Sequence, residues 1–587
     1  MSTSFRAPGA QLSLDELLAR ARPDLTPPAR ERLVSGGAIS IGGRPGRRLK
    51  TRVEPGLLVE VRGEAPGAHF EAADSWYALI PALPWRAGRL DCRSGGGKGV
   101  VRKGGSGVVF EQLGEREGVC ELRVRGAADA VRSALARAGC PVLGDVEYAG
   151  ILVAGGVRLV AAAGARPAGW WPEEPVFPES GPRGGLNLAV SDATRRVLGR
   201  GHPWVLRDDD TGDASCFVPG TRVELVAANG EALGTAHVEG SGRLTARVWT
   251  ARGAADASVE ARVAAALKRR RKLLDAKQTD VYRLVHGEAD RLPGLFVDRL
   301  GSLLRVLVTS PGTGGYRNRA LDVIVRALRS QLGSNPPVVE TLHLRDRPAG
   351  TLECTRLVRG DASSLAEALV VREADVGYCI DPGLERPERA RPGVGLYLDQ
   401  RVNRERLLAA VPAGRLLNLF AHTGAFSVAW LASGREQAVS VDLSGAYLRR
   451  LEQNLELNGI DLGRHRSVKQ DARRFLESLE PSERFEAIVL DPPTAASAGH
   501  RFWSVARELS PLVSRALSHL SPGGVLLVSR NDRRRSKLRE LVARAAEESG
   551  VPLAGVRPAP PGSDFPRLAG FAEGDPFSAV IATRASG

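Results

Sequence analysis

Three polar features end successive apolar segments in the C-terminal part of the chain. The loop NLFAHTGAFS holds one glycine, Gly424, instead of the GxGxxG that cradles a pyrophosphate, so a cofactor without phosphates fits it better. Asp442 closes AVSVD, where a carboxylate can accept both hydroxyls of a ribose. Asp471 follows SVKQ, where it can accept from an adenine amino group. Acidic residues are also common after strands because they cap the next helix. Three polar features at the ends of successive strands, however, favour the interpretation that this edge of a sheet binds an adenosine group.

A fourth apolar segment, EAIVL, ends in Asp491-Pro492-Pro493-Thr494. Prolines force an extended, rigid turn, and its carbonyl groups are not taken up by a helix. Such a turn can face a flat substrate base. The simpler interpretation is a turn that only ends a strand.

From Gly395 onward, strand and helix patterns alternate regularly. Apolar strands in a βαβα order predict a parallel sheet with helices on both faces, and ligands of such sheets bind beyond the carboxyl ends of the strands. The length of 587 residues is too great for one core. The predicted fold class is therefore multidomain α/β, with a Rossmann-like sheet at the C-terminus preceded by a β-barrel and small α+β modules.

The motifs together carry a specific resemblance over about residues 186–587. NLFAHTGAFS, VDLSGAYLRRLEQNLELNG, the Asp-Pro-Pro-Thr turn and GLYLDQRVNR (Gly395–Arg404) strongly resemble the bacterial ribosomal RNA large-subunit methyltransferases of the I and K types. The resemblance implies a class I fold, S-adenosylmethionine as cofactor and a base of RNA, above all 23S ribosomal RNA, as substrate. The cofactor-binding residues that it implies are Asp399, Asn418, Phe420, Thr423, Gly424, Phe426, Asp442, Leu443, Asp471, Ala472 and Asp491. His422 departs from the family, in which tyrosine is usual at this place.

The methylated atom depends on a missing cysteine. Methylating cytosine at C5 needs a thiolate to attack C6 first. The I-type relatives carry that cysteine after the strand that follows the Asp-Pro-Pro motif, whereas this chain has Ser529-Arg530-Asn531-Asp532 there and no cysteine beyond Cys379. The stretch is similar to Ser-Asn-Asn-Lys-Arg of the K-type enzyme, which methylates guanine N7. Guanine N7 has a lone pair and no proton, so that reaction needs only positioning.

The residues expected at the target base follow from these motifs. We predict catalytic roles for Asp491, Pro492, Pro493 and Asn531. Thr494, Arg530 and Arg401 are expected to bind the substrate. Guanine N7 is the predicted target, and cytosine C5 is the alternative.

The upstream sequence divides into predicted RNA-binding modules. The ranges are 12–64, an αβ RNA-binding module; 76–164, a reduced synthase-like domain; 165–185, a Pro/Gly-rich linker; 186–252, a β-barrel; 255–385, an α+β linking domain; and 392–587, the methyltransferase domain. The first resembles the domain named after ribosomal protein S-four at Leu14, Asp15, Leu18, Pro23, Arg30, Leu33, Val34, Gly36, Ile39, Ile41, Gly43, Lys50, Val53 and Gly56. The barrel resembles the PUA domain at HPWV (202–205) and RVWT (247–250).

The synthase-like range resembles a shortened pseudouridine synthase. Arg89-Leu90-Asp91 with Ser94-Gly95-Gly96 is similar to that family's catalytic-aspartate motif, and GCPVLGDVEYAG (139–150) to a later landmark. Only about 30 residues separate the two landmarks, fewer than the intact catalytic sheet uses. Asp91 is therefore predicted to be vestigial, and catalysis of uridine isomerisation by Asp91 is the alternative.

Composition agrees with an RNA partner without proving it. The net charge of +15 and the pI near 10.0 suit a polyanion, although solvated arginines would give the same values. The run Lys268–Lys272 is either a solvated helix face or a phosphate contact. Six scattered cysteines without CxxC spacing predict neither disulfides nor a metal site. With no signal peptide or long apolar run, we expect a cytoplasmic protein without membrane contact. The residues carry no signal of oligomeric state, and a non-catalytic ribosome-assembly factor is a further alternative.

Overall fold

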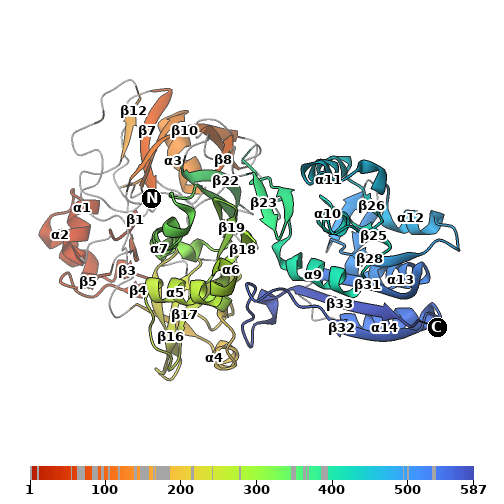
Figure 1. The fold of residues 1–587 in the computed structure, drawn as a ribbon. Helices are drawn as coiled ribbons and strands as arrows, with labels where there is room; N and C mark the ends of the chain where they lie inside the picture. Colours follow the sequence, from red (N-terminus) through yellow and green to blue (C-terminus); the bar gives the residue numbers. More distant parts are fainter. Residues whose placement is uncertain are drawn as a thin grey trace.

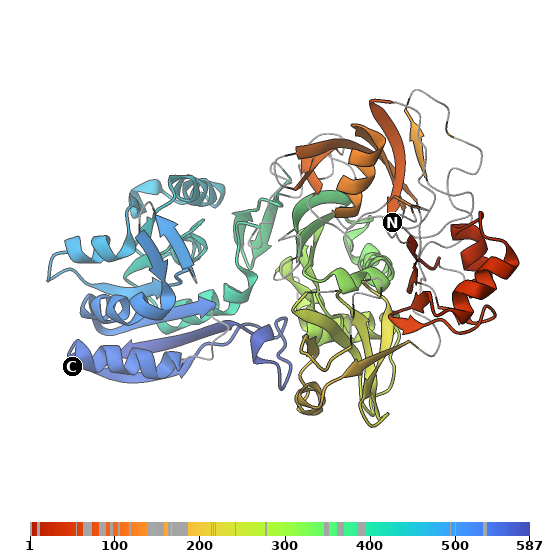
Figure 2. The same ribbon diagram turned by 180° about the vertical axis from the view of Figure 1, so that it is seen from behind.

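The fold is seen in a computed structural model of the chain. The structure describes residues 3–8, 12–54, 56–62, 73–81, 90–93, 98–103, 106–116, 119–137, 142–143, 145, 158–162, 166, 186–212, 214, 217, 219–240, 242–275, 279–344, 352–360, 365, 369–384, 394–493, 495–498, 501–531 and 537–586. Of the predicted linker at 165–185, these ranges include only Arg166, and they do not include Thr494. Two lobes are visible, one from the N-terminal sheets and one from the C-terminal sheet (Figures 1 and 2).

The N-terminal module pairs two helices with a small sheet. Helices α1 (Leu14–Ala21) and α2 (Pro27–Ser35) pack on strands ordered β1-β6-β3-β4. The bounds are β1 Thr3–Arg6, β2 Leu12–Ser13, β3 Ile39–Ile41, β4 Arg44–Pro45, β5 Arg52–Val53 and β6 Leu58–Val61. Ser13 caps α1 in a reciprocal box with Glu16, because its side chain accepts from the Glu16 N–H. Strand β1 precedes the range 12–64 that the sequence suggested.

A six-stranded antiparallel sheet follows, in the order β12-β7-β11-β10-β9-β8. Its elements are β7 Ser75–Pro81, β8 Leu90–Arg93, β9 Lys98–Lys103, β10 Ser106–Arg116, β11 Val119–Arg125, α3 Ala128–Arg137 and β12 Leu159–Ala161. Arg132 and Asp145 form a buried two-bond ion pair at 2.8 and 2.7 Å beneath the sheet. Asp91 belongs to β8, but its side chain lies outside the described part of the structure.

Two further five-stranded sheets complete the N-terminal lobe, in the orders β13-β15-β16-β17-β14 and β18-β19-β20-β21-β22. The first contains β13 Asn187–Val190, α4 Asp192–Gly199, β14 Trp204–Leu206, β15 Arg222–Ala227, β16 Ala232–Val238 and β17 Leu244–Ala251. The second contains α5 Val259–Arg269, α6 Arg271–Asp275, β18 Val281–His286, β19 Leu295–Leu300, β20 Leu303–Val308, α7 Arg317–Leu332, β21 Val338–Leu344 and β22 Leu352–Arg359. Both sheets share one hydrophobic cluster through Trp249 and Tyr316.

The C-terminal lobe is a seven-stranded sheet in the order β27-β26-β25-β28-β31-β33-β32. Strands β25 to β28 and β31 are parallel, and β33 is antiparallel. The elements are α9 Arg401–Ala410, β25 Arg415–Leu419, α10 Ala425–Ala432, β26 Gln437–Asp442, α11 Gly445–Leu457, β27 His465–Lys469, α12 Ala472–Ser478, β28 Phe485–Leu490, β29 Ala495–Ala498, β30 Arg501–Ser504, α13 Val505–Ser518, β31 Leu520–Asn531, α14 Leu538–Glu548, β32 Leu553–Pro558 and β33 Phe577–Arg584. The predicted coverage of both faces by helices is confirmed, whereas the sheet is mixed and not wholly parallel, because β33 is antiparallel.

Alternating side chains of each strand bury the two faces of this sheet. On β25, Leu416 joins the cluster formed with α9, α10 and α11, whereas Leu417 joins the cluster formed with α12, α13 and α14. The hairpin of β23 (Val370–Glu373) and β24 (Val376–Cys379) packs on the first of these faces through Tyr378. This hairpin falls in the predicted linking range 255–385. It also bonds to the N-terminal lobe, because the Arg372 N–H donates to Asp280 Oδ1 at 2.7 Å, so it contacts both lobes.

The loop before β33 joins the two lobes (Figure 1). Asp564 is fully buried in it and accepts from the Arg283 N–H at 3.2 Å and from Arg401 at 2.9 Å. Arg270 donates to the Asp564 carbonyl at 2.8 Å and pairs with Asp290. Arg270 is therefore fully buried, and both interpretations of Lys268–Lys272, a solvated helix face and a phosphate contact, are wrong at this position. Within the described ranges, no helix has the length and apolar character needed to cross a bilayer.

Candidate active site

A cavity of about 880 Å³ lies at the carboxyl ends of β25, β26 and β28. Parallel sheets bind ligands at this edge, next to the point where the strand order reverses, and here that point lies between β25 and β28. Most of the predicted site residues line it. They are Asp399, Asn418, Phe420, Thr423, Phe426, Asp442, Leu443, Asp471, Asp491, Pro492, Pro493 and Asn531.

The loop after β25 has an unusual backbone. Phe420, His422 and Gly424 all have positive φ, at 60°, 51° and 75°. A Cβ atom on Gly424 would lie 2.1 Å from Cγ of Leu451. Gly424 does not line the cavity itself, so its role here is to let the loop turn against α11. Backbone strain of this kind concentrates at ligand sites, and it brings Phe420 and Thr423 to the cavity wall.

Asp442 holds this loop in place. Its Oδ2 accepts from the His422 N–H at 2.9 Å, and its Oδ1 accepts from the Ser444 N–H at 2.8 Å. A carboxylate has about four acceptor positions, so both oxygens keep capacity for ligand hydroxyls. The neighbouring Leu443 exposes 48% of its surface at the cavity, as an apolar wall for a flat ring.

Asp471 caps helix α12, which is the alternative role that the sequence left open for an acidic residue after a strand. Its Oδ1 accepts from the N–H groups of Arg473 and Arg474 at 3.1 and 3.2 Å. It lines the cavity as well, so a capping role and a ligand-binding role coexist in one side chain. Ala472, the first residue of α12, is buried and does not line the cavity.

A buried polar chain supports Asn418 in β25. Its Nδ2 donates to Ser427 Oγ at 3.0 Å, and Ser427 contacts Ser440 Oγ at 2.7 Å. Burial lowers the pKa of His465, which contacts Ser440, to about 4. Its imidazole is therefore neutral at pH 7. The chain fixes Asn418 beneath the cavity floor without adding charge.

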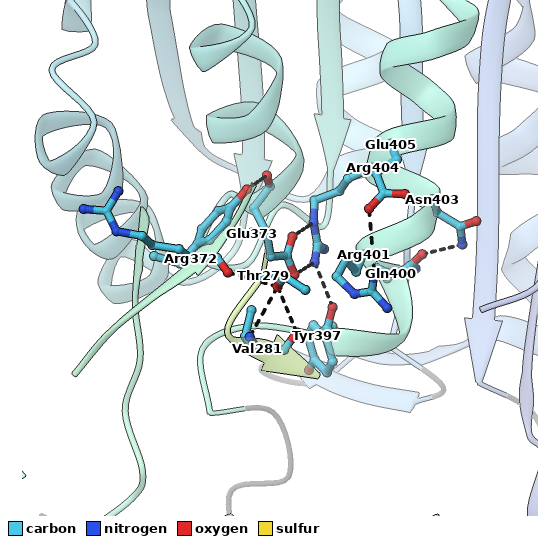
Figure 3. Close-up of polar contacts among 12 residues, drawn as sticks. Thr279, Val281, Arg372, Glu373, Tyr397, Gln400, Arg401, Asn403, Arg404 and Glu405 are labelled. Carbon is cyan, nitrogen blue, oxygen red and sulfur yellow. Dashed lines mark hydrogen bonds and ion pairs between the residues drawn. The ribbon is translucent and has the colours of Figure 1, made fainter. Parts of the chain in front are cut away.

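Side chains at the start of α9 contact three different acidic residues, and Figure 3 shows one of these contacts, that of Arg404 with Glu373. Arg404 lines the cavity and pairs with Glu373 through two bonds of 2.8 and 2.5 Å. It also donates to the Tyr397 carbonyl at 3.3 Å. Gln400 turns toward Asp491, at 2.9 Å. Arg401 points to Asp564 and does not line the cavity, so the predicted contact of Arg401 with substrate has no counterpart in this geometry.

Asp491 and the two prolines form the wall next to β31. Ser529 donates to Asp491 Oδ1 at 2.7 Å and is fully buried. Burial raises the pKa of Asp491, while the hydrogen bonds from Ser529 and Gln400 oppose that rise. Asn531 lines the cavity at the end of β31, whereas Arg530 is buried and does not line it. No cysteine lines the cavity among the residues that the structure describes.

Sequence reasoning missed an aromatic group at the cavity mouth. Tyr397 lies 5.1 Å from His422, and His422 lies 4.2 Å from Tyr447, between ring centroids. Burial lowers the pKa of His422 to about 4, so it is a neutral ring at pH 7. Tyr397 and Tyr447 expose 43% and 44% of their surfaces. Tyrosines inside two family motifs, GLYLDQ and SGAYLRR, were the available signal.

Comparisons with known proteins agree with this geometry. A family model of S-adenosylmethionine-dependent methyltransferases matches residues 367–561. Ribosomal RNA large subunit methyltransferase I of Aeromonas salmonicida is 31% identical over 362 residues, covering 60% of this chain and 88% of the relative. The protein of the same name from Cronobacter sakazakii is 29% identical over 397 residues, covering 66% and 97%.

Solved structures show the same fold. A candidate methyltransferase complexed with SAH matches with a TM-score of 0.54 at 20% identity, covering 68% of this chain and 100% of that chain. A candidate S-adenosylmethionine-dependent methyltransferase from Streptococcus mutans matches with a TM-score of 0.53, the same identity and the same coverage.

Proposed function

This chain belongs to the family of ribosomal RNA large subunit methyltransferases and uses S-adenosylmethionine, and from that premise we propose that it methylates N7 of a guanine in 23S ribosomal RNA. The observation that carries the choice of atom is the state of Ser529. It stands where the sequence resemblance expects a nucleophile for C5 chemistry, and it is fully buried with its hydroxyl bonded to Asp491. A hydroxyl in that position has no access to a base.

The cavity suits the cofactor without a phosphate cradle. Asp442 would hold the ribose hydroxyls, Asp471 the adenine amino group, and Leu443 the face of the ring. Thr423, Asn418 and Asp399 would surround the methionine part. When bound, S-adenosylmethionine supplies an electrophilic methyl group on a sulfonium sulfur.

The opposite wall suits a planar base taken out of its stack. Pro492 and Pro493 offer a rigid apolar surface, and Asp491 and Asn531 offer polar groups beside it. The ionised Asp491 carboxylate can accept from guanine N1–H and its amino group, which leaves N7 on the other edge of the ring. Since N7 has a lone pair and no proton, the residues need only to orient it.

Cytosine C5 is the second candidate, because the curated relatives are methyltransferases of the I type. The sequence resemblance associates that type with a cysteine nucleophile. The last cysteine of this chain is Cys379, on β24. Cytosine chemistry by the ordinary covalent route would therefore have to use Cys379 or an earlier residue.

The N-terminal modules are proposed to hold the RNA. Arg44, Arg47, Arg48 and Lys50 are exposed on one short segment of the first module. Such a cluster can neutralise phosphates without reading sequence. About a third of the chain lies outside the match to the Cronobacter sakazakii relative.

Transfer of label from S-adenosylmethionine to unmodified 23S ribosomal RNA tests the proposal. The wild-type protein should place the label in 7-methylguanosine, and Cys379→Ser should retain this activity. Asp491→Asn should lose it. Label in 5-methylcytosine that disappears in Cys379→Ser would support the second candidate instead, and no label with wild-type protein would contradict both.

A further inference from the structure

A chain of hydrogen bonds with one fixed direction runs into Asp491. Arg406 donates to Asn403 Oδ1 at 2.7 Å, and Asn403 Nδ2 donates to Gln400 Oε1 at 2.8 Å. Gln400 Nε2 then donates to Asp491 Oδ2 at 2.9 Å and to Ser529 Oγ at 2.8 Å. Ser529 in turn donates to Asp491 Oδ1 at 2.7 Å.

The chemistry of the donors sets this direction. An arginine side chain has donors only, so Asn403 must turn its oxygen toward Arg406 and its NH₂ group toward Gln400. Gln400 must then turn its own NH₂ group toward Asp491. Both hydrogens of that NH₂ group are used, and the single Ser529 proton is left for Asp491. Figure 3 shows the Asn403 to Gln400 step on the first turn of α9.

The consequence falls on Asp491. Both of its oxygens accept a hydrogen bond, and these bonds are stronger to the carboxylate than to the protonated acid, so they favour the ionised form against the effect of burial. Asp491 lines the cavity, and a carboxylate oxygen that accepts one hydrogen bond keeps acceptor capacity for a ligand. Gln400, Asn403 and Ser529 are almost completely buried, so water does not compete with these bonds.

We infer that Gln400 and Ser529 are positioning residues, which hold Asp491 as an oriented, ionised hydrogen-bond acceptor for the N–H groups of the target base. The inference rests on the proposed function, because it assigns the base-binding edge of that site. In this role Asp491 accepts hydrogen bonds and transfers no proton. The inference also gives Ser529 a role that requires no nucleophile.

Other charged groups also face Asp491 and must be kept constant in a test. The charge of Asp491 raises the pKa of Asp399 and of Tyr397, and Arg404 favours the ionisation of Asp491. Two variants act on the chain without touching these groups. Ser529→Ala removes one donor, and Gln400→Glu keeps the shape but replaces the donating NH₂ group by an acceptor. Glu405→Gln, on the exposed side of the same helix, is the matched control.

The direct experiment is a titration of the Asp491 carboxyl carbon by ¹³C NMR, assigned by its loss in Asp491→Asn. Removing one hydrogen bond to a charged group should raise the pKa of Asp491 by about one unit in Ser529→Ala, and Gln400→Glu should raise it at least as far. Glu405→Gln should leave it unchanged. An unchanged Asp491 pKa in Ser529→Ala would overturn the inference, whatever Gln400→Glu shows, because the added carboxyl group of Gln400→Glu raises the Asp491 pKa by its like charge as well.

The acid limb of the pH profile for RNA methylation should move with the NMR titration. A purely structural loss would lower the rate at all pH values without moving that limb. The titration needs no methyl transfer, so it decides the inference even if the wild-type protein transfers no label and the proposed function fails.

Discussion

Gly424→Ala perturbs the shape of the loop that forms the cofactor wall. Gly424 has φ of +75°, and an added Cβ would lie 2.1 Å from Leu451 Cγ. The left-handed backbone costs a residue with a Cβ about 1–2 kcal/mol, and forcing a methyl group into a packed core costs about 1–3 kcal/mol more. The free energy of unfolding should therefore fall by about 2–5 kcal/mol. The affinity for S-adenosylmethionine should fall with it, because Phe420 and Thr423 leave the cavity wall.

Gly434→Ala is the matched control for that change. Gly434 has φ of +88° in the same domain, and nothing lies within 4 Å of its added Cβ. Its free energy of unfolding should fall by only about 1–2 kcal/mol, which is the cost of the left-handed backbone alone. Adding Leu451→Ala to Gly424→Ala should recover the collision part, seen as a coupling of about 1–3 kcal/mol in a double-mutant cycle. Urea unfolding and calorimetric titration measure both effects, and equal losses for Gly424→Ala and Gly434→Ala would refute the reasoning.

Three further predictions concern the charged groups of the site. Glu373→Gln removes the charged partner of the buried Arg404. Urea unfolding should therefore show a fall of about 3–5 kcal/mol in the free energy of unfolding, and a fall below about 1 kcal/mol would contradict the importance of this ion pair. Burial, and then the neighbouring Asp491 carboxylate, raise the pKa of Asp399 to about 7, so the folded protein binds the Asp399 proton more tightly than the unfolded chain does. The stability that this proton contributes is fully present below about pH 4 and should be lost as the pH rises through 7. The melting temperature should therefore fall less over this range in Asp399→Asn than in the wild type, and parallel curves would refute the prediction. Asp442→Asn should weaken S-adenosylmethionine binding about tenfold or more in calorimetry, whereas the exposed control Asp461→Asn should not, and equal affinities would contradict the ribose contact.

The part of the site that the sequence predicted is the part that local pattern controls. Asp442 is the last residue of β26, Asp471 lies two residues after β27, and Asp491 directly follows β28. Parallel strands bring their carboxyl ends to one edge of the sheet. The sequence also singled out Gly424, as a sign of a cofactor without phosphates, but the structure gives a different reason for a glycine there. Gly424 is required by its contact with Leu451 of α11, which the sequence spacing does not reveal.

The contacts that could not be predicted join residues far apart in the chain. Gln400 and Ser529 are separated by 129 positions, and Arg270 and Asp564 by 294. No periodic pattern records such pairs. Arg270 was predicted to be solvated or in contact with phosphate, and Arg401 to contact substrate, whereas both are buried and bonded to Asp564. The sign of a charge predicts a partner of opposite sign, and it does not tell an internal carboxylate from a phosphate.

Nucleoside mapping of 23S ribosomal RNA from cells with and without this protein tests the central claim most directly. Mass spectrometry of the digested RNA should show the loss of one 7-methylguanosine from the cells that lack the protein, and its return when the wild-type chain, but not Asp491→Asn, is restored. Loss of a 5-methylcytosine instead, or an identical set of methylated nucleosides in both RNAs, would contradict the account.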